Sequence, residues 1–218
     1  MIVQIAGVRN KQELNIIINS GATSIGFPLR LPVHKEDTSE QDAKALIKQI
    51  PSNIYKVLIT YMDSSKEIIE LATYLGTDMI QLHGEIKVSE LATIKGKHPQ
   101  IKIIKSLIVK QDNFSELKKT IAEFEDNVDF FITDTFDPDT GASGATGKTH
   151  DWEISKKIVK LSKKPVIIAG GLTPDNVGQA IKIIRPAGVD VHTGVENSLG
   201  EKEPALVNKF VIEANKNL

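Results

Sequence analysis

Residues 165–193 read PVIIAGGLTPDNVGQAIKIIRPAGVDVHT, a strand pattern, a helix pattern and a second strand pattern in succession. The segment PVIIA at 165–169 is short and β-rich, and VDVHT at 189–193 is a second segment of the same kind. Between them, NVGQAIKIIR at 176–185 has the apolar spacing of an amphipathic helix, which Thr173-Pro174 is expected to cap. This order predicts a βαβ unit with parallel strands.

The same alternation runs along the whole chain. Further strand patterns lie at 2–6, 24–27, 55–60, 78–82, 101–107 and 128–133. Further helix patterns lie at 11–20, 39–50, 65–75, 87–95, 112–124, 151–161 and 204–216. Eight βα units in this order predict a single-domain (β/α)8 TIM barrel over residues 1–218. A doubly wound open sheet fits less well, because Gly7 stands alone where such folds carry G-x-G-x-x-G.

The composition narrows the choice of partners. Acidic and basic residues nearly balance, with a formal net charge of -1, so the chain lacks the basic surface that nucleic acid or an anionic membrane selects. No apolar run approaches the roughly 20 residues that span a bilayer. The absence of cysteine excludes disulfides, thiolate metal sites and a cysteine nucleophile, and it suits a reducing compartment. We expect a cytoplasmic monomer or homodimer whose partner is a small molecule, with no nucleic acid and no membrane.

Glycines follow the last two predicted strands, at the end of the barrel where the βα-loops carry the chemistry. Gly170 and Gly171 follow the strand at 165–169, and Thr193 and Gly194 follow the last strand. These two loops are the usual phosphate site of such barrels, because glycine lets backbone N–H groups approach an anion closely. The alternative is that the glycines only form tight turns. Both loops together predict a phosphorylated small-molecule substrate.

A segment rich in Gly, Asp and Thr, DTFDPDTGASGATGKTHDW at 134–152, follows the sixth strand and is typical of an active-site lid. Asp134 is expected at or just beyond the end of that strand, where a carboxylate is a candidate general acid or base; a brace for the loop is the alternative. GATGKT resembles a nucleotide P-loop, but that motif requires glycine where this chain has Ala142. A nucleoside triphosphate site is therefore not expected.

Two histidines are predicted at the same end of the barrel as Asp134. His83 ends the fourth strand pattern, and His192 lies at the end of the eighth. A metal site built from these residues is a weaker hypothesis, because their spacing is not diagnostic and histidines packed at strand ends are common. We expect no metal ion and no other cofactor.

Four segments resemble the phosphoribosylanthranilate isomerase family in order and spacing, namely QLHGE at 81–85, the segment 134–152, IIAGGLTPDNV at 167–177 and RPAGVDVHTGVE at 185–196. The resemblance implies a (β/α)8 barrel in tryptophan biosynthesis that converts an aminoaldose phosphate to an aminoketose phosphate without a cofactor. It implies that Asp134 is the general acid that protonates the ring oxygen of the sugar. It places the phosphate at Gly170, Gly171, Thr193 and Gly194, with Thr193 where the family more often has serine. Other substrate contacts are expected at Gln81, His83, Gly147, Asp190 and His192.

The first strand departs from this resemblance at the position of the general base. The family reads Lys-Ile-Cys-Gly there, whereas this chain reads Gln4-Ile5-Ala6-Gly7. Removing a proton from the second carbon of the sugar requires a basic atom within about 3 Å, and the methyl group of Ala6 cannot supply one. Ala6 therefore predicts little turnover of phosphoribosylanthranilate unless another residue, such as His83 or a lid carboxylate, serves as the base.

A second departure follows the second strand. The family usually carries an arginine there that pairs with the anthranilate carboxylate, and Glu36 stands at that position. An acidic side chain opposite an anionic group repels it, which is one way to reject a ligand. Arg30 and Lys35 lie nearby in the sequence and are candidates to compensate.

Three classes of function stay open at this point. The first, which we favour, is an isomerase acting on a phosphorylated sugar-like substrate, with either a substitute base or a changed substrate. The second is a lyase or decarboxylase on the same scaffold. The third is a barrel that binds a phosphorylated ligand without turnover. The retained lid and Asp134 favour an enzyme, whereas the fold alone would not.

Overall fold

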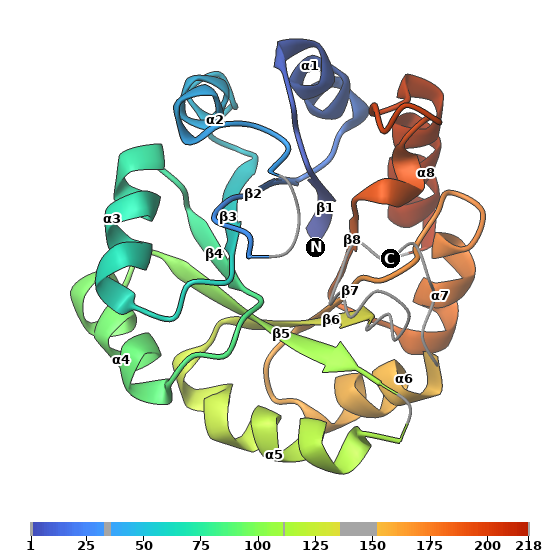
Figure 1. Cartoon of the computed structure of the whole chain (residues 1–218). Helices are drawn as coiled ribbons and strands as arrows, with labels where there is room; N and C mark the ends of the chain where they lie inside the picture. Colours follow the sequence, from blue (N-terminus) through green and yellow to red (C-terminus); the bar gives the residue numbers. More distant parts are fainter. Residues whose placement is uncertain (1, 33–35, 111, 136–151, 218) are drawn as a thin grey trace.

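The computed structural model describes residues 2–32, 36–110, 112–135 and 152–217, which form a closed parallel barrel (Figure 1). The strands are β1 (Ile2–Ala6), β2 (Ser24–Pro28), β3 (Tyr55–Thr60), β4 (Met79–Leu82), β5 (Lys102–Val109), β6 (Phe130–Thr135), β7 (Val166–Ile168) and β8 (Gly188–Val191). Each strand pairs in parallel with the next, and β8 closes the barrel on β1. The predicted (β/α)8 barrel is confirmed.

Helices surround the barrel on all sides in Figure 1. They are α1 (Lys11–Ser20), α2 (Glu40–Ile47), α3 (Ser65–Leu75), α4 (Val88–Lys97), α5 (Phe114–Phe124), α6 (Trp152–Leu161), α7 (Val177–Ile184) and α8 (Pro204–Asn217), with 3₁₀ turns η1 (Glu125–Asn127) and η2 (Thr193–Val195). Among the described residues, no helix is long and apolar enough to cross a bilayer.

Two strand boundaries differ from the prediction in ways that affect the site. β6 continues to Thr135, so Asp134 is the penultimate residue of the strand and lies inside it. β8 ends at Val191, so His192 and Thr193 belong to the connection that follows. Asp134 is therefore held by strand pairing, because its partner on β5 is Ile108.

Helix α7 begins at Val177, so the prediction that Thr173-Pro174 caps it is wrong. The Asn176 side chain accepts a hydrogen bond from the Thr173 N–H (2.8 Å) and donates one to the Gly171 carbonyl (2.9 Å). An asparagine that bonds neighbouring backbone in this way favours a turn over a helix. Residues 174–176 therefore form a turn, which fixes the loop after β7.

Alternation of side chains along the strands separates two apolar cores. The larger core lies between the strands and the helices. The smaller one fills the barrel and includes Ala6, Ile59, Ile132 and Ala169. Because side chains two residues apart share a face, Asp134 projects inward above Ile132. The barrel interior is thus apolar below Asp134 on β6.

The register of the seam between β1 and β8 decides which residues share a level. Gln4 is opposite Asp190, and Ile5 is opposite Val191. Ala6 ends β1 and His192 follows β8, so these two residues come directly after the Ile5–Val191 pair. The end of β1 and the connection after β8 therefore lie side by side.

Candidate active site

A chain of polar side chains crosses the interior of the barrel. The Ser24 hydroxyl donates to Oε1 of Gln4 (3.0 Å), and Nε2 of Gln4 donates to Oε1 of Gln81 (2.9 Å). Nε2 of Gln81 lies 2.9 Å from Nε2 of His83, the residue that follows β4. Ser24, Gln4 and Gln81 are fully buried, so each polar group depends on its neighbour. This series of hydrogen bonds fixes the orientation of the His83 ring.

His83 is held as a neutral imidazole. Burial, with a smaller effect from the charge of Lys105, lowers its pKa to about 3. The ring also stacks on Tyr61, with 5.4 Å between ring centroids. A group with such a low pKa is a weak base near neutral pH. His83 is therefore poorly suited to replace the base that is missing at Ala6.

The Asp134 carboxyl keeps its proton to a higher pH than an ordinary aspartate does. Burial raises the pKa of its carboxyl to about 7, and the nearby Asp190 raises it further, against the hydrogen bond from the Thr135 N–H to Oδ1 (2.7 Å). The other oxygen, Oδ2, lies 3.8 Å from Nε2 of His83. A carboxyl whose pKa lies near the working pH is well matched to donate a proton. The role of Asp134 as the general acid stays a prediction.

Asp190 lies deeper in the barrel, beside Gln4. Burial raises the pKa of its carboxyl to about 6, although the hydrogen bond with Gln4 acts in the opposite direction. Oδ1 of Asp190 has no hydrogen-bond partner in the described part of the chain. A buried oxygen without a partner is available to a polar group of a ligand.

A cleft at the carboxyl ends of the strands joins Asp134 to the glycine loops. It is lined by Asp134, Ala169, Gly170, Gly171, Leu172, Asp190, Val191, His192, Thr193 and Gly194. Gly170 and Gly171 have φ angles of 92° and 63°, which glycine adopts without strain. Seven of the residues expected from the sequence therefore share one cleft.

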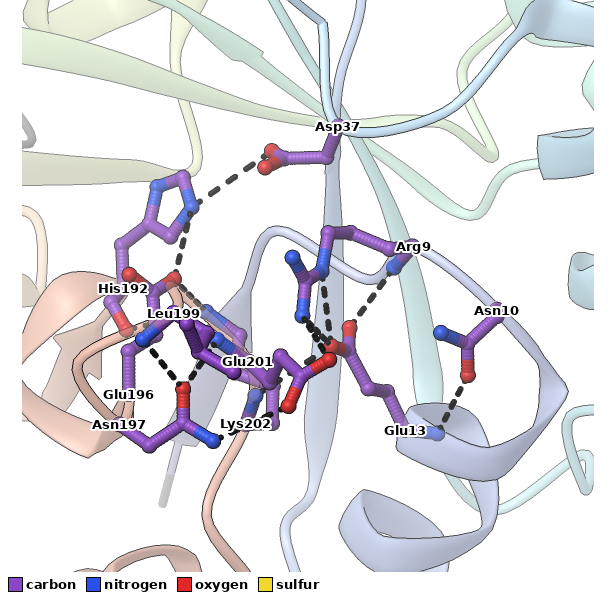
Figure 2. A network of polar contacts seen from close by, with 10 residues as sticks. All are labelled: Arg9, Asn10, Glu13, Asp37, His192, Glu196, Asn197, Leu199, Glu201 and Lys202. Carbon is purple, nitrogen blue, oxygen red and sulfur yellow. Dashed lines mark hydrogen bonds and ion pairs between the residues drawn. The ribbon is translucent and has the colours of Figure 1, made fainter.

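His192 lies at the edge of this cleft, in contact with β1. A Cβ atom on Gly7 would lie 2.0 Å from Nε2 of His192, so the imidazole packs directly against that glycine. Nε2 is 3.5 Å from a carboxylate oxygen of Asp37 and 3.5 Å from one of Glu196, as Figure 2 shows. The two histidines are thus in different surroundings. The His83 side chain is 8% exposed, whereas the His192 side chain is 22% exposed and lies between two carboxylates.

Arg30 and Glu36 are paired locally, and neither lines the cleft. Nε of Arg30 lies 2.8 Å from a carboxylate oxygen of Glu40 on α2, and the Arg30 N–H donates to the Glu36 carboxylate. Their roles toward a substrate stay predictions. Lys35 and Gly147 lie outside the described residues.

Sequence reasoning missed Asp37 and Lys202. Asp37 comes from the β2–α2 connection and reaches His192, while the buried Nζ of Lys202 donates to the His192 carbonyl (3.0 Å) and to Glu196 (2.6 Å). No spacing in the sequence links these residues, because the barrel brings together loops that are far apart in the chain. Only the position of Asp37 beside Glu36 was a signal. No group of three metal-binding side chains occurs among the residues described.

Known proteins match almost the whole length of this chain. The sequence profile of N-(5'phosphoribosyl)anthranilate (PRA) isomerase matches residues 3–213. The chain belongs to this family. N-(5'-phosphoribosyl)anthranilate isomerase 2 of Methanosarcina mazei is 36% identical over 215 residues, which cover 98% of this chain and 94% of that protein.

Solved structures of the family have the same fold. The phosphoribosyl anthranilate isomerase of Thermotoga maritima matches with a TM-score of 0.84 and 28% identity, covering 99% of this chain and 100% of that one. A PRA isomerase in complex with reduced 1-(o-carboxyphenylamino)-1-deoxyribulose 5-phosphate matches with a TM-score of 0.82 and 25% identity, again covering 99% and 100%.

Membership of the PRA isomerase family identifies the chain as an isomerase of the aldose–ketose type. The two other classes considered from the sequence, a lyase or decarboxylase and a ligand-binding barrel without turnover, are not favoured. Within this family Ala6 stays the main departure, since it ends β1 as a buried methyl group.

Proposed function

We propose that this protein converts N-(5'-phosphoribosyl)anthranilate to the corresponding aminoketose phosphate. The observation that carries the proposal is the buried carboxyl of Asp134, whose pKa is raised to about 7, in the same cleft as the glycine loops after β7 and β8. A proton donor and a phosphate site are what the ring-opening step requires.

In the proposed first step, Asp134 donates its proton to the ring oxygen of the ribose. The bond between that oxygen and C1 breaks as the nitrogen lone pair forms a C1=N iminium. Backbone N–H groups at Gly171, Thr193 and Gly194 are proposed to hold the phosphate, which keeps the sugar aligned with Asp134. A base then removes the proton on C2 to give an enolamine, which tautomerises to the ketone.

A direct assay tests the proposed function. Phosphoribosylanthranilate is fluorescent, so the wild-type protein should remove its fluorescence at a rate proportional to enzyme concentration. The same gene should restore growth without tryptophan to a bacterial strain that lacks the isomerase. Stable fluorescence together with no growth would overturn the proposal. The weak turnover expected from Ala6 alone is tested by the same measurement.

Ligand binding gives a second prediction that does not depend on turnover. Inorganic phosphate at millimolar concentration should raise the melting temperature, because a ligand that binds only the folded state stabilises it. The reduced aminoketose phosphate should raise it more, because it also contacts the sugar-binding groups. Differential scanning fluorimetry with sulfate-free buffer measures both. An unchanged melting temperature with either ligand would contradict the assigned phosphate site.

The pH dependence of turnover follows from the protonation of Asp134. The group must carry its proton to act as an acid, and its pKa in the folded protein is about 7. We therefore expect kcat/KM to fall as the pH rises above about 7, approaching a tenfold loss per pH unit. A pH profile from 6 to 9 checks this. A flat profile across that range would exclude Asp134 as the titrating acid.

The proposal also covers the cellular location and the oligomeric state of the enzyme. A cytoplasmic location is supported by the absence of cysteine, and a monomer or homodimer is the expected assembly. Size-exclusion chromatography with light scattering measures the assembly directly.

A further inference from the structure

The unanswered chemical question in this site is which group removes the proton from C2. Ala6 ends β1 with a methyl group, and the pKa of His83 is too low for an effective base. Asp190 pairs in register with Gln4, one inward-facing level deeper than Ala6. A side chain that replaces the base missing at Ala6 is expected to lie beside the end of β1.

His192 meets that requirement. Ile5 and Val191 are the last residues paired across the β1–β8 seam, and Ala6 and His192 come directly after them. If Gly7 carried a Cβ atom, the nearest atom to it would be Nε2 of His192, at 2.0 Å. The ring therefore occupies the space next to the residue after Ala6. His192 also lines the cleft that contains Asp134 and the glycine loops, and its side chain keeps 22% exposure, so a ligand can reach it.

Two carboxylates set the orientation of this ring. Both Asp37 and Glu196 approach Nε2, each at 3.5 Å, as Figure 2 shows. A nitrogen between carboxylates carries the N–H of the neutral ring, which leaves Nδ1 as the proton acceptor. Once Nδ1 has taken a proton, the carboxylates stabilise the imidazolium, as aspartate does in the Ser-His-Asp triad.

The two carboxylates contribute differently. Glu196 is 2.6 Å from Nζ of the buried Lys202, so its charge is shared with that ammonium group. Burial acts to raise the pKa of Asp37, but the hydrogen bond and charge of His192 outweigh it, with help from Lys202 and Arg9, and the pKa is lowered overall. Asp37 is therefore ionised at neutral pH and is the carboxylate free to compensate His192.

We propose that His192 is the general base of this enzyme, in place of the cysteine that the family carries at Ala6, and that Asp37 is its positioning residue. This inference rests on the proposed function, because it names the base of the isomerisation.

The proposed proton transfers balance without any further reactant. Nδ1 of His192 takes the proton from C2 of the iminium; the C–H electron pair becomes the C1=C2 bond, and the C1=N pair returns to nitrogen. The imidazolium then returns a proton to C1, while the hydroxyl on C2 gives its proton to the Asp134 carboxylate. The product is the aminoketose, and both groups end in their starting protonation states.

Substitution of His192 tests the inference. His192→Gln should lower kcat by about 10²- to 10⁴-fold, the usual contribution of a positioned general base. The primary deuterium isotope effect with substrate deuterated at C2 should rise, because proton removal becomes slower than the other steps. Binding of the reduced aminoketose phosphate should stay within a few-fold. His98→Gln, at the opposite end of the barrel before β5, is the matched control and should behave as wild type.

Restoring the thiol provides the decisive second variant. In the His192→Gln background, Ala6→Cys should recover at least tenfold in kcat at pH 8.5, where an ordinary thiol is about half ionised. The same Ala6→Cys change should recover nothing in an Asp134→Asn background, because the acid would still be missing. Asp37→Asn should lower kcat less than His192→Gln and leave KM nearly unchanged.

The possible results distinguish a wrong reaction from a wrong base. An inactive wild-type protein overturns the proposed function and the inference with it. An active wild type whose His192→Gln variant keeps its kcat overturns the inference alone. Loss of kcat without a larger isotope effect and without recovery by Ala6→Cys assigns His192 a structural role and also overturns it.

Discussion

Asp134→Asn is expected to lower kcat/KM for phosphoribosylanthranilate by about 10²- to 10⁴-fold, the usual contribution of a positioned general acid. Asparagine preserves the shape of the side chain but has no proton to give to the ring oxygen of the sugar. Affinity for the reduced aminoketose phosphate, measured by isothermal titration calorimetry, should change little, since its ring is already open. Turnover within a few-fold of wild type would remove Asp134 from the reaction.

The same variant should be no less stable than the wild type above pH 7. Burial raises the pKa of the Asp134 carboxyl from 3.8 to about 7 in the folded protein, so the folded state binds a proton that the unfolded state has released. Between these two pKa values the contribution of Asp134 to stability falls as the pH rises. Asparagine cannot ionise and avoids that loss. Thermal unfolding at pH 5 and pH 8 measures this effect. The melting temperature of the variant, relative to that of the wild type, should be higher at pH 8 than at pH 5.

This comparison separates catalysis from folding. An enzyme commonly keeps a group that lowers stability because the reaction requires it. A variant that loses turnover while gaining stability at pH 8 has a defect in chemistry. A variant that loses both would show that Asp134 mainly braces the loop after β6, the alternative that the sequence left open.

Gly194→Ala is expected to raise the KM for phosphoribosylanthranilate by about 10- to 150-fold, which corresponds to losing one charge-assisted hydrogen bond of about 1.5–3 kcal/mol. A Cβ atom at this position would lie 1.9 Å from the Leu172 carbonyl oxygen and 3.0 Å from its carbon. Both are backbone atoms, so the loops after β7 and β8 must move apart. The backbone N–H groups that are proposed to hold the phosphate would move with them.

A matched control makes this prediction specific. Gly96→Ala introduces the same methyl group on α4, where a Cβ meets nothing within 4 Å, and it should leave KM unchanged while favouring the helix. Steady-state kinetics and phosphate-induced thermal shifts compare the two variants. Equal KM values for Gly194→Ala and the wild type would place the phosphate elsewhere.

The strand and helix patterns predicted the barrel because a parallel (β/α)8 fold repeats one local unit. Each β-rich run and amphipathic helix can be identified from its own residues, and the order of the units leaves one closed arrangement. The glycines after β7 and β8 and the carboxylate on β6 could be found in the same way, since in such a barrel the ends of the strands converge. Their roles in phosphate binding and proton transfer stay predictions.

Local signals failed where a side-chain contact competed with them. The pair Thr173-Pro174 has the composition of a helix start, yet α7 begins at Val177 because Asn176 ties the preceding residues into a turn. The ion pair between Arg30 and Glu40 likewise could not be predicted from the sequence, since it joins a loop to the following helix. Such contacts depend on side-chain geometry that periodicity does not contain.

By itself, then, the sequence determined the fold, the family resemblance and the loss of a base at Ala6, because each can be read from residues that are neighbours in the chain. The tertiary structure decided the chemistry that surrounds that loss. Burial in the barrel sets the pKa of Asp134 near 7 and that of His83 near 3. Closure of β8 on β1 brings the His192 ring against Gly7, the residue after Ala6, and the β2–α2 connection brings Asp37 to that ring. Solvation and through-space charge depend on distances that exist only once the barrel has closed.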